Sequence, residues 1–207
     1  MRLGIASAEN LSRAALLRRG AIGSGALLAS ASGLGALAPA ASAAAPPAGD
    51  LAYLRLLIAA ELLAVDFYGQ AIARHDLTQS YAARAERIAA DEAQHYTLLA
   101  GLLSAAGQTP ATADDIDFSY RAAIFKGTSS VLSFAQELER VLVGAYVDAL
   151  VNVQTPEYRQ TMAQILANEA RHQSAIAGLQ KKPIVGGPLP TPIGMSTVSD
   201  FLDNYES

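Results

Sequence analysis

The chain of 207 residues has no cysteine, no tryptophan and few phenylalanines. The absence of cysteine excludes disulfides, zinc–cysteine sites, iron–sulfur clusters and thiol nucleophiles. What the chain has in quantity is alanine, the strongest helix former, so the composition favours helices over strands. Its length is sufficient for one domain with a complete core, with room for a tail.

Residues 1–45 differ in composition from the rest of the chain. They hold four arginines, a single acidic residue and then most of a mildly apolar run of small residues, "GAIGSGALLASASGLGALAPAASAAAPP", which ends at Pro47. A basic start, an apolar stretch and an Ala-x-Ala site indicate an export signal, with cleavage after Ala43 or Ala45. We therefore expect the mature protein in the periplasm, in the cell envelope or outside the cell.

The export route is suggested by the Arg18–Arg19 pair, which resembles a twin-arginine signal. Small residues such as Gly20 and Ala21 follow the pair, where bulky apolar residues are usual. The twin-arginine route carries folded proteins, often with their metal already loaded. Ordinary secretion is an alternative, and so is an uncleaved membrane anchor, since residues 21–45 are long enough to span a bilayer.

The net charge argues against nucleic acid as a partner. Residues 1–43 contain four arginines and one glutamate, so their removal shifts the formal net charge from -4 to -7. The remaining chain has no basic arm or patch. Because neutralising phosphates requires clustered lysines and arginines, we expect no binding of nucleic acid.

Four long segments have apolar residues at three- and four-residue spacing, which predicts four amphipathic helices. They cover residues 50–75, 78–106, 129–153 and 155–181. Asp50 and Thr155 are predicted to cap the first and the fourth helix. About two residues join the helices within each pair, so each pair forms an antiparallel hairpin.

The link over residues 107–128 is long enough to run back along the helices. Short, long and short connections predict an all-α, ferritin-like four-helix bundle over residues 46–182, with a long crossover between helices two and three. Residues 183–207 are rich in proline and glycine. We expect them to form an extended tail with a short helix near 196–203.

The two predicted hairpins align as a repeat, which indicates a duplicated helical hairpin. Each hairpin has a Glu, a Tyr seven residues later, and a Glu-x-x-His in its second helix. These residues are Glu61, Tyr68, Glu92 and His95 in the first hairpin, and Glu139, Tyr146, Glu169 and His172 in the second.

The repeated Glu-x-x-His predicts a metal centre. Residues three apart on a helix point the same way, so the pair can hold one ion. Two such pairs facing two single glutamates supply four carboxylates and two imidazoles, the ligands of dinuclear carboxylate proteins. That set suits two Fe or two Mn ions better than copper or zinc. The predicted ligands are Glu61, Glu92, His95, Glu139, Glu169 and His172.

Some of these assignments have alternatives. Glu137 is also available in the third helix, but only Glu139 has the apolar neighbours that mark a buried stripe. A single Glu-x-x-His is usually a solvated pair, so a coincidental or degenerate site is the competing interpretation. Burying four acids without a metal would be costly, however. His75 is interpreted as a helix-end residue that interacts with the dipole.

Four more side chains are predicted to support the ligands. Tyr68 and Tyr146 lie two turns after Glu61 and Glu139 and can hydrogen-bond a ligand carboxylate; the alternative is a core tyrosine with its hydroxyl at the rim. Asp91 and Asn168 each precede a ligand Glu. Either can orient an imidazole across the bundle, because a ligating His usually donates its free N–H. The alternative for both is solvation or pairing along the helix.

Three stretches resemble a known family: "LRLLIAAELLAVDFYGQAI", "DEAQHYTLLAGLLSAAGQTP" and "IDFSYRAAIF". They are similar to the exported ferritin-like domain family that includes plant desiccation-related and fungal stress-induced proteins. The resemblance runs from about residue 50 to 180. It implies a ferritin-like bundle with the six ligands named above, all of which are present. The wider superfamily includes ferroxidases, manganese catalases, rubrerythrin-type peroxidases and oxygenases. A rubredoxin-like cysteine module is absent.

The expected function is therefore that of a dinuclear metal oxidoreductase that reduces O₂ or H₂O₂ in stress protection, with no catalytic residue beyond the ligands. The alternative is a non-catalytic stress or envelope protein that uses the bundle to bind a partner or surface. Iron storage in a cage ranks last, because no fifth packing helix is apparent. A homodimer is a reasonable expectation for such a bundle.

Overall fold

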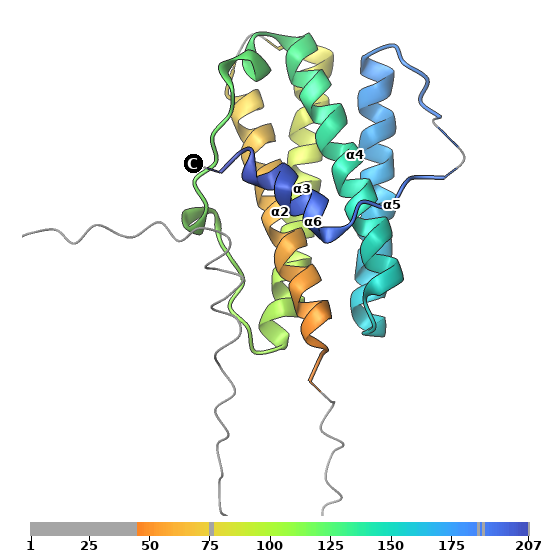
Figure 1. The fold of residues 1–207 in the computed structure, drawn as a ribbon. Helices are drawn as coiled ribbons and strands as arrows, with labels where there is room; N and C mark the ends of the chain where they lie inside the picture. Colours follow the sequence, from red (N-terminus) through yellow and green to blue (C-terminus); the bar gives the residue numbers. More distant parts are fainter. Residues whose placement is uncertain (1–44, 75–76, 186, 188, 207) are drawn as a thin grey trace, which may run out of the picture.

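The computed structural model describes residues 45–74, 77–185, 187 and 189–206. The export signal predicted in residues 1–45 therefore lies, except for Ala45, outside the described residues, as does His75. Four helices run along one another and a shorter one crosses them (Figure 1). They are α2 (Ala48–Ile72), α3 (Gln79–Ala105), α4 (Thr128–Asn152), α5 (Pro156–Leu179) and α6 (Met195–Asp203). The predicted all-α, ferritin-like bundle is confirmed.

The connection between α3 and α4 is the predicted long crossover. It starts at Gly107, whose φ of 72° suits a glycine at the end of a helix. From there it runs from one end of the bundle to the other and forms two short 3-10 turns, η1 (Ala113–Asp115) and η2 (Ala122–Phe125) (Figure 1). The hydroxyl of Tyr96 donates to the carbonyl of Ala111 at 3.0 Å, which holds the crossover to α3.

The prediction that Asp50 caps α2 is wrong. The helix begins at Ala48, and Asp50 lies within its first turn with 1% of its surface exposed. Its carboxylate instead accepts from the backbone N–H groups of Gln154 and Thr155, at 3.0 and 2.7 Å, and from the Thr155 hydroxyl at 2.6 Å. Thr155 occupies the N-cap position of α5 but makes no side-chain cap bond; its hydroxyl donates to Asp50.

The other hairpin has a weaker version of the same contact. The N–H of Thr78, before α3, donates to the hydroxyl of Thr128, at the start of α4, at 3.2 Å. The first helix of each hairpin thus accepts a hydrogen bond from the turn of the other. This exchange follows from the duplication, since antiparallel hairpins bring the start of one beside the turn of its partner.

Residues 189–194 lead back to the bundle and into α6 (Figure 1). The N–H of Ile193 donates to the carbonyl of Gly144 in α4 at 2.9 Å. A Cβ at position 144 would lie 2.4 Å from the Ile193 side chain, so only glycine permits this approach. Helix α6, which begins one residue before the predicted short helix, then buries Val198 and Leu202.

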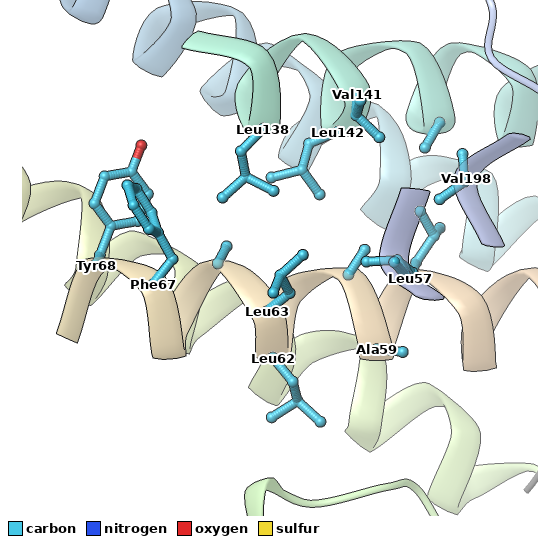
Figure 2. Close-up of a cluster of buried hydrophobic side chains, with 14 of the residues drawn as sticks. Leu57, Ala59, Leu62, Leu63, Phe67, Tyr68, Leu138, Val141, Leu142 and Val198 are labelled. Atoms are coloured by element: carbon cyan, nitrogen blue, oxygen red, sulfur yellow. The ribbon is translucent and has the colours of Figure 1, made fainter. Parts of the chain in front are cut away.

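The hydrophobic core lies mainly between α2 and α4. In Figure 2, Leu63 of α2 lies opposite Leu138 and Leu142 of α4, and Leu57 of α2 lies near Val198 of α6. All five side chains are no more than 6% exposed. Each hairpin contributes one face of this core, which leaves the glutamates and histidines enclosed among apolar neighbours. Among the helices of the described residues, none combines the length and apolar character needed to cross a membrane.

Candidate metal centre

The six predicted ligands meet in the interior of the bundle. The four glutamates have no exposed surface, and the two histidines are 4% exposed. Helices α2 and α4 each supply one of the six ligands, and α3 and α5 each supply two. In chain order the ligands are Glu61, Glu92, His95, Glu139, Glu169 and His172. Helical spacing explains the gathering, because each Glu-x-x-His presents both side chains on the face that its helix buries.

The ligand atoms form two overlapping groups that can each hold a metal ion. One group contains Glu61, Glu92, His95 and Glu169, and the other contains Glu92, Glu139, Glu169 and His172. Within each group the ligand atoms all lie within 4.8 Å of one another. Glu92 and Glu169 belong to both groups, so each can present a carboxylate to two neighbouring ions.

Both imidazoles turn Nδ1 towards the carboxylates. Nδ1 of His95 lies 2.7 Å from Glu169 Oε1 and 3.1 Å from Glu92 Oε2. Nδ1 of His172 lies 3.0 Å from Glu92 Oε1. The rings stack with their centroids 5.9 Å apart. Each histidine therefore contacts the glutamate of the opposite hairpin, and the two halves of the repeat complete one another.

The polar atoms in this cluster fit a metal better than they fit one another. Within this cluster, five buried carboxylate oxygens and Nδ1 of His172 have no aligned hydrogen-bond partner. The oxygens are Glu61 Oε2, Glu92 Oε1, Glu139 Oε2, Glu169 Oε1 and Glu169 Oε2. Buried polar atoms are normally paired, and carboxylate oxygens with imidazole nitrogens are the ligands that iron and manganese accept. The carboxylate oxygens and imidazole nitrogens of the cluster therefore fit iron or manganese as ligands.

The electrostatics of the cluster are those of a crowded, buried site. Burial raises the pKa of Glu61 to about 8, with the neighbouring Glu92 charge adding to the effect. Burial also raises the pKa of Glu139 well above its usual range. Burial lowers the pKa of His95, but Glu169, Glu61 and Glu92 outweigh it and raise that pKa to about 12. Without metal, the site thus keeps protons that cations would displace.

The two tyrosines connect the hairpins. The hydroxyl of Tyr68 in α2 donates to Oε1 of Glu139 in α4, and the hydroxyl of Tyr146 in α4 donates to Oε1 of Glu61 in α2. Both tyrosines are fully buried. The hydroxyls lie inside the core rather than at its rim. Each tyrosine therefore fixes the carboxylate of the opposite hairpin and leaves Oε2 directed at the cluster.

Asp91 and Asn168 lie behind the imidazoles, between α3 and α5. Oδ2 of Asp91 is 3.3 Å from Nε2 of His172. Nδ2 of Asn168 is 3.1 Å from Nε2 of His95 and 3.2 Å from Nε2 of His172. Burial opposes ionisation of Asp91, but hydrogen bonds from His172 and Asn168 and the Arg87 charge outweigh it and lower its pKa.

Two other residues, Glu137 and Tyr81, differ in their relation to the cluster. Glu137 lies outside the cluster, with 49% of its side chain exposed and an ion pair to Arg140 at 2.6 Å. Tyr81, which sequence reasoning overlooked, is fully buried, and its hydroxyl has no partner among the described residues. Burial and the charge of Glu139 raise its pKa. A signal was available, because Tyr81 precedes Glu92 by eleven residues, as Tyr158 precedes Glu169.

Comparisons with known proteins agree with this architecture. The model of the family described as "Ferritin-like domain" matches residues 49–182, which include all six residues of the cluster. No curated protein matches the chain. A solved structure, the bacterioferritin-related protein of Bacteroides fragilis, described as a dodecameric thioferritin, is similar with a TM-score of 0.56 and 17% identity. The match covers 64% of this chain and 84% of that one. At this identity, the likeness shows the fold alone.

Proposed function

The chain belongs to the ferritin-like domain family, and we propose that its carboxylate–histidine cluster holds two Fe or two Mn ions that react with O₂ or peroxide. The observation that carries the proposal is the overlap of the two ligand groups. Two separate mononuclear sites would need no common ligand, whereas these groups share Glu92 and Glu169. Shared carboxylates are what a pair of adjacent ions requires.

Each position in the pair would receive the same kinds of ligand. Glu61 and His95 would serve one ion, Glu139 and His172 the other, and the two shared glutamates would serve both. When bound, such ions supply the redox chemistry that side chains cannot. The protein holds the carboxylates in place through the tyrosine hydroxyls and keeps bulk water out through a fully buried core.

The biological setting is part of the proposal. The basic, small-residue segment at residues 1–45 supports export, and the stretches quoted above support a desiccation-related or stress-induced subfamily. Protection against peroxide or reactive iron suits such a setting. The Bacteroides fragilis neighbour is a dodecamer, which supports assembly of this chain with copies of itself, the homodimer being the simplest case.

The experiment is elemental analysis of the mature protein, purified from a host that exports it. The test variant is Glu92→Ala/Glu169→Ala, which removes both shared carboxylates. The matched control is Glu137→Ala, which removes an exposed glutamate from α4. We expect close to two Fe or Mn per chain in the wild type and in the control, and a loss of both ions in the double variant. Consumption of peroxide and of O₂ with Fe(II) is then compared across the three proteins.

Two results would contradict the proposal at different levels. Wild-type protein without Fe or Mn, and with the thermal stability of the double variant, would mean that the cluster is a polar core without a cofactor. Metal-loaded protein that consumes neither oxidant would favour the alternative, a non-catalytic stress or envelope protein in which the metal is structural.

A further inference from the structure

The two imidazoles differ in what lies behind them. Nε2 of His172 lies 3.3 Å from the carboxylate of Asp91 and 3.2 Å from the amide of Asn168, whereas the partner of Nε2 of His95 is the amide of Asn168, at 3.1 Å. Asp91 is anchored in turn by Arg87 one helical turn earlier, at 3.5 Å. The six ligands repeat faithfully between the hairpins, but this supporting pair does not.

Asp91 and Asn168 occupy equivalent places in the repeat. Each directly precedes a shared glutamate, and each lies four residues before a histidine of its own helix. They contact one another across the α3–α5 seam, where the amide of Asn168 donates a hydrogen bond to Asp91. Two carboxylates at this contact would repel each other. One acid and one amide can pair, so only one imidazole is backed by a negative charge.

Metal binding fixes the direction of these hydrogen bonds. An imidazole that binds an ion through Nδ1 carries its proton on Nε2 and must donate from there. Asp91 is a pure acceptor. Asn168 turns its donor Nδ2 towards both Nε2 atoms, so it supplies neither ring with an acceptor while it donates to Asp91. A carboxylate behind the ring makes the imidazole a stronger donor to the metal than a neutral amide does.

We propose that Asp91 and Asn168 make the two metal positions unequal, so that the ion beside His172 binds more tightly than the ion beside His95. The inference rests on the proposed dinuclear centre and assigns an order of filling to it. Partners behind a ligating histidine change metal affinity by about 10–100-fold when they are altered. We expect the two dissociation constants to differ by a factor in this range. Asp91 is a positioning residue here, because it acts through His172.

The experiment is anaerobic titration of the metal-free, mature protein with Mn²⁺ alone. Binding is measured by calorimetry and by the electron paramagnetic resonance signal of free Mn²⁺. Wild-type protein should bind in two resolved steps. Asp91→Asn puts an amide behind both imidazoles, so its two steps should converge through weakening of the tighter one. Glu86→Gln, which removes an exposed negative charge from the same helix, should behave like the wild type. Thermal melts check that each variant is folded.

Two single-ligand variants locate the tighter position. His95→Ala leaves the position beside His172, and His172→Ala leaves the position beside His95. The ion that remains in His95→Ala should bind more tightly than the ion that remains in His172→Ala. Adding Asp91→Asn should weaken the binding of the ion in His95→Ala and leave that of the ion in His172→Ala nearly unchanged.

The outcomes separate the inference from the function on which it rests. Two ions bound with equal affinity in the wild type, or two steps unchanged by Asp91→Asn, would overturn the inequality and leave the dinuclear centre in place. His95→Ala that binds its ion no more tightly than His172→Ala would also overturn it. No Mn²⁺ or Fe²⁺ bound by the wild type would remove both proposals together.

Discussion

Replacing Asp50 with alanine should loosen the contact between the two hairpins. The carboxylate is 1% exposed and accepts from two backbone N–H groups and one hydroxyl of residues 154 and 155, between 2.6 and 3.0 Å. All these donors belong to the turn that starts α5. The substitution therefore removes a link between the start of α2 and the opposite hairpin, and leaves the N–H groups of Gln154 and Thr155, just before α5, without this acceptor.

The expected loss follows from the number and kind of these bonds. A hydrogen bond to a charged group contributes about 1.5–3 kcal/mol, and neighbouring bonds to one carboxylate are not additive. Water can reach the exposed Gln154 and offset some of the loss. We expect about 3 kcal/mol for Asp50→Ala. For a domain of this size, that corresponds to a fall in Tm of roughly 6–12 °C.

The repeat supplies a matched control at Thr128. Its hydroxyl makes the equivalent contact in the other half, a single neutral bond of 3.2 Å from the N–H of Thr78. Thr128→Ala should cost below about 1 kcal/mol. Both variants are compared by thermal and urea unfolding in the metal-free state, which keeps metal affinity out of the measurement. Equal losses in the two variants, or no loss in Asp50→Ala, would show that Asp50 does not hold the hairpins together.

Three further predictions concern the site and the tail. Metal-free protein should be more stable at pH 5 than at pH 8, because folding raises the pKa of Glu61 from 4.5 to about 8 and that of His95 from 6.5 to about 12. The free energy of unfolding therefore falls as the pH rises from the unfolded to the folded pKa of each group. Thermal melts of chelator-treated protein test this, and a higher Tm at pH 8 than at pH 5 would contradict it. Tyr68→Phe removes the hydroxyl that donates to the Glu139 carboxylate and should weaken the binding of Mn²⁺, measured by calorimetry, by about 10–100-fold. Circular dichroism should show that the fold is retained. Unchanged affinity would mean that the hydroxyl does not position the carboxylate for the metal. Gly144→Ala should detach the segment before α6 and make it sensitive to limited proteolysis, because the new Cβ would clash with the Ile193 side chain. Gly144→Ala/Ile193→Ala should restore resistance to the protease. Equal resistance of the wild type and both variants would refute the role of the close approach between residues 144 and 193.

The sequence predicted most of the fold because the relevant signals are local. Apolar spacing within each helix, short turns and one long link were sufficient for the four helices and their connectivity. The structure places the helix ends within about three residues of those expected. The composition of the candidate cluster was also available, since the duplication marks the same Glu, Tyr and Glu-x-x-His in both halves.

The sequence by itself could not determine in which hairpin each side chain finds its hydrogen-bond partner. Tyr68 contacts Glu139 rather than a neighbour in its own hairpin, and Asp50 accepts from the turn before α5 rather than from its own helix. These pairings depend on how two hairpins dock, and residue spacing along one helix contains no information on that. The same holds for the Asp91–Asn168 contact behind the histidines. Local periodicity determined the elements and the ligand types, and only tertiary packing decided the partners, because contacts between distant segments are fixed by the complementary shapes of the assembled core.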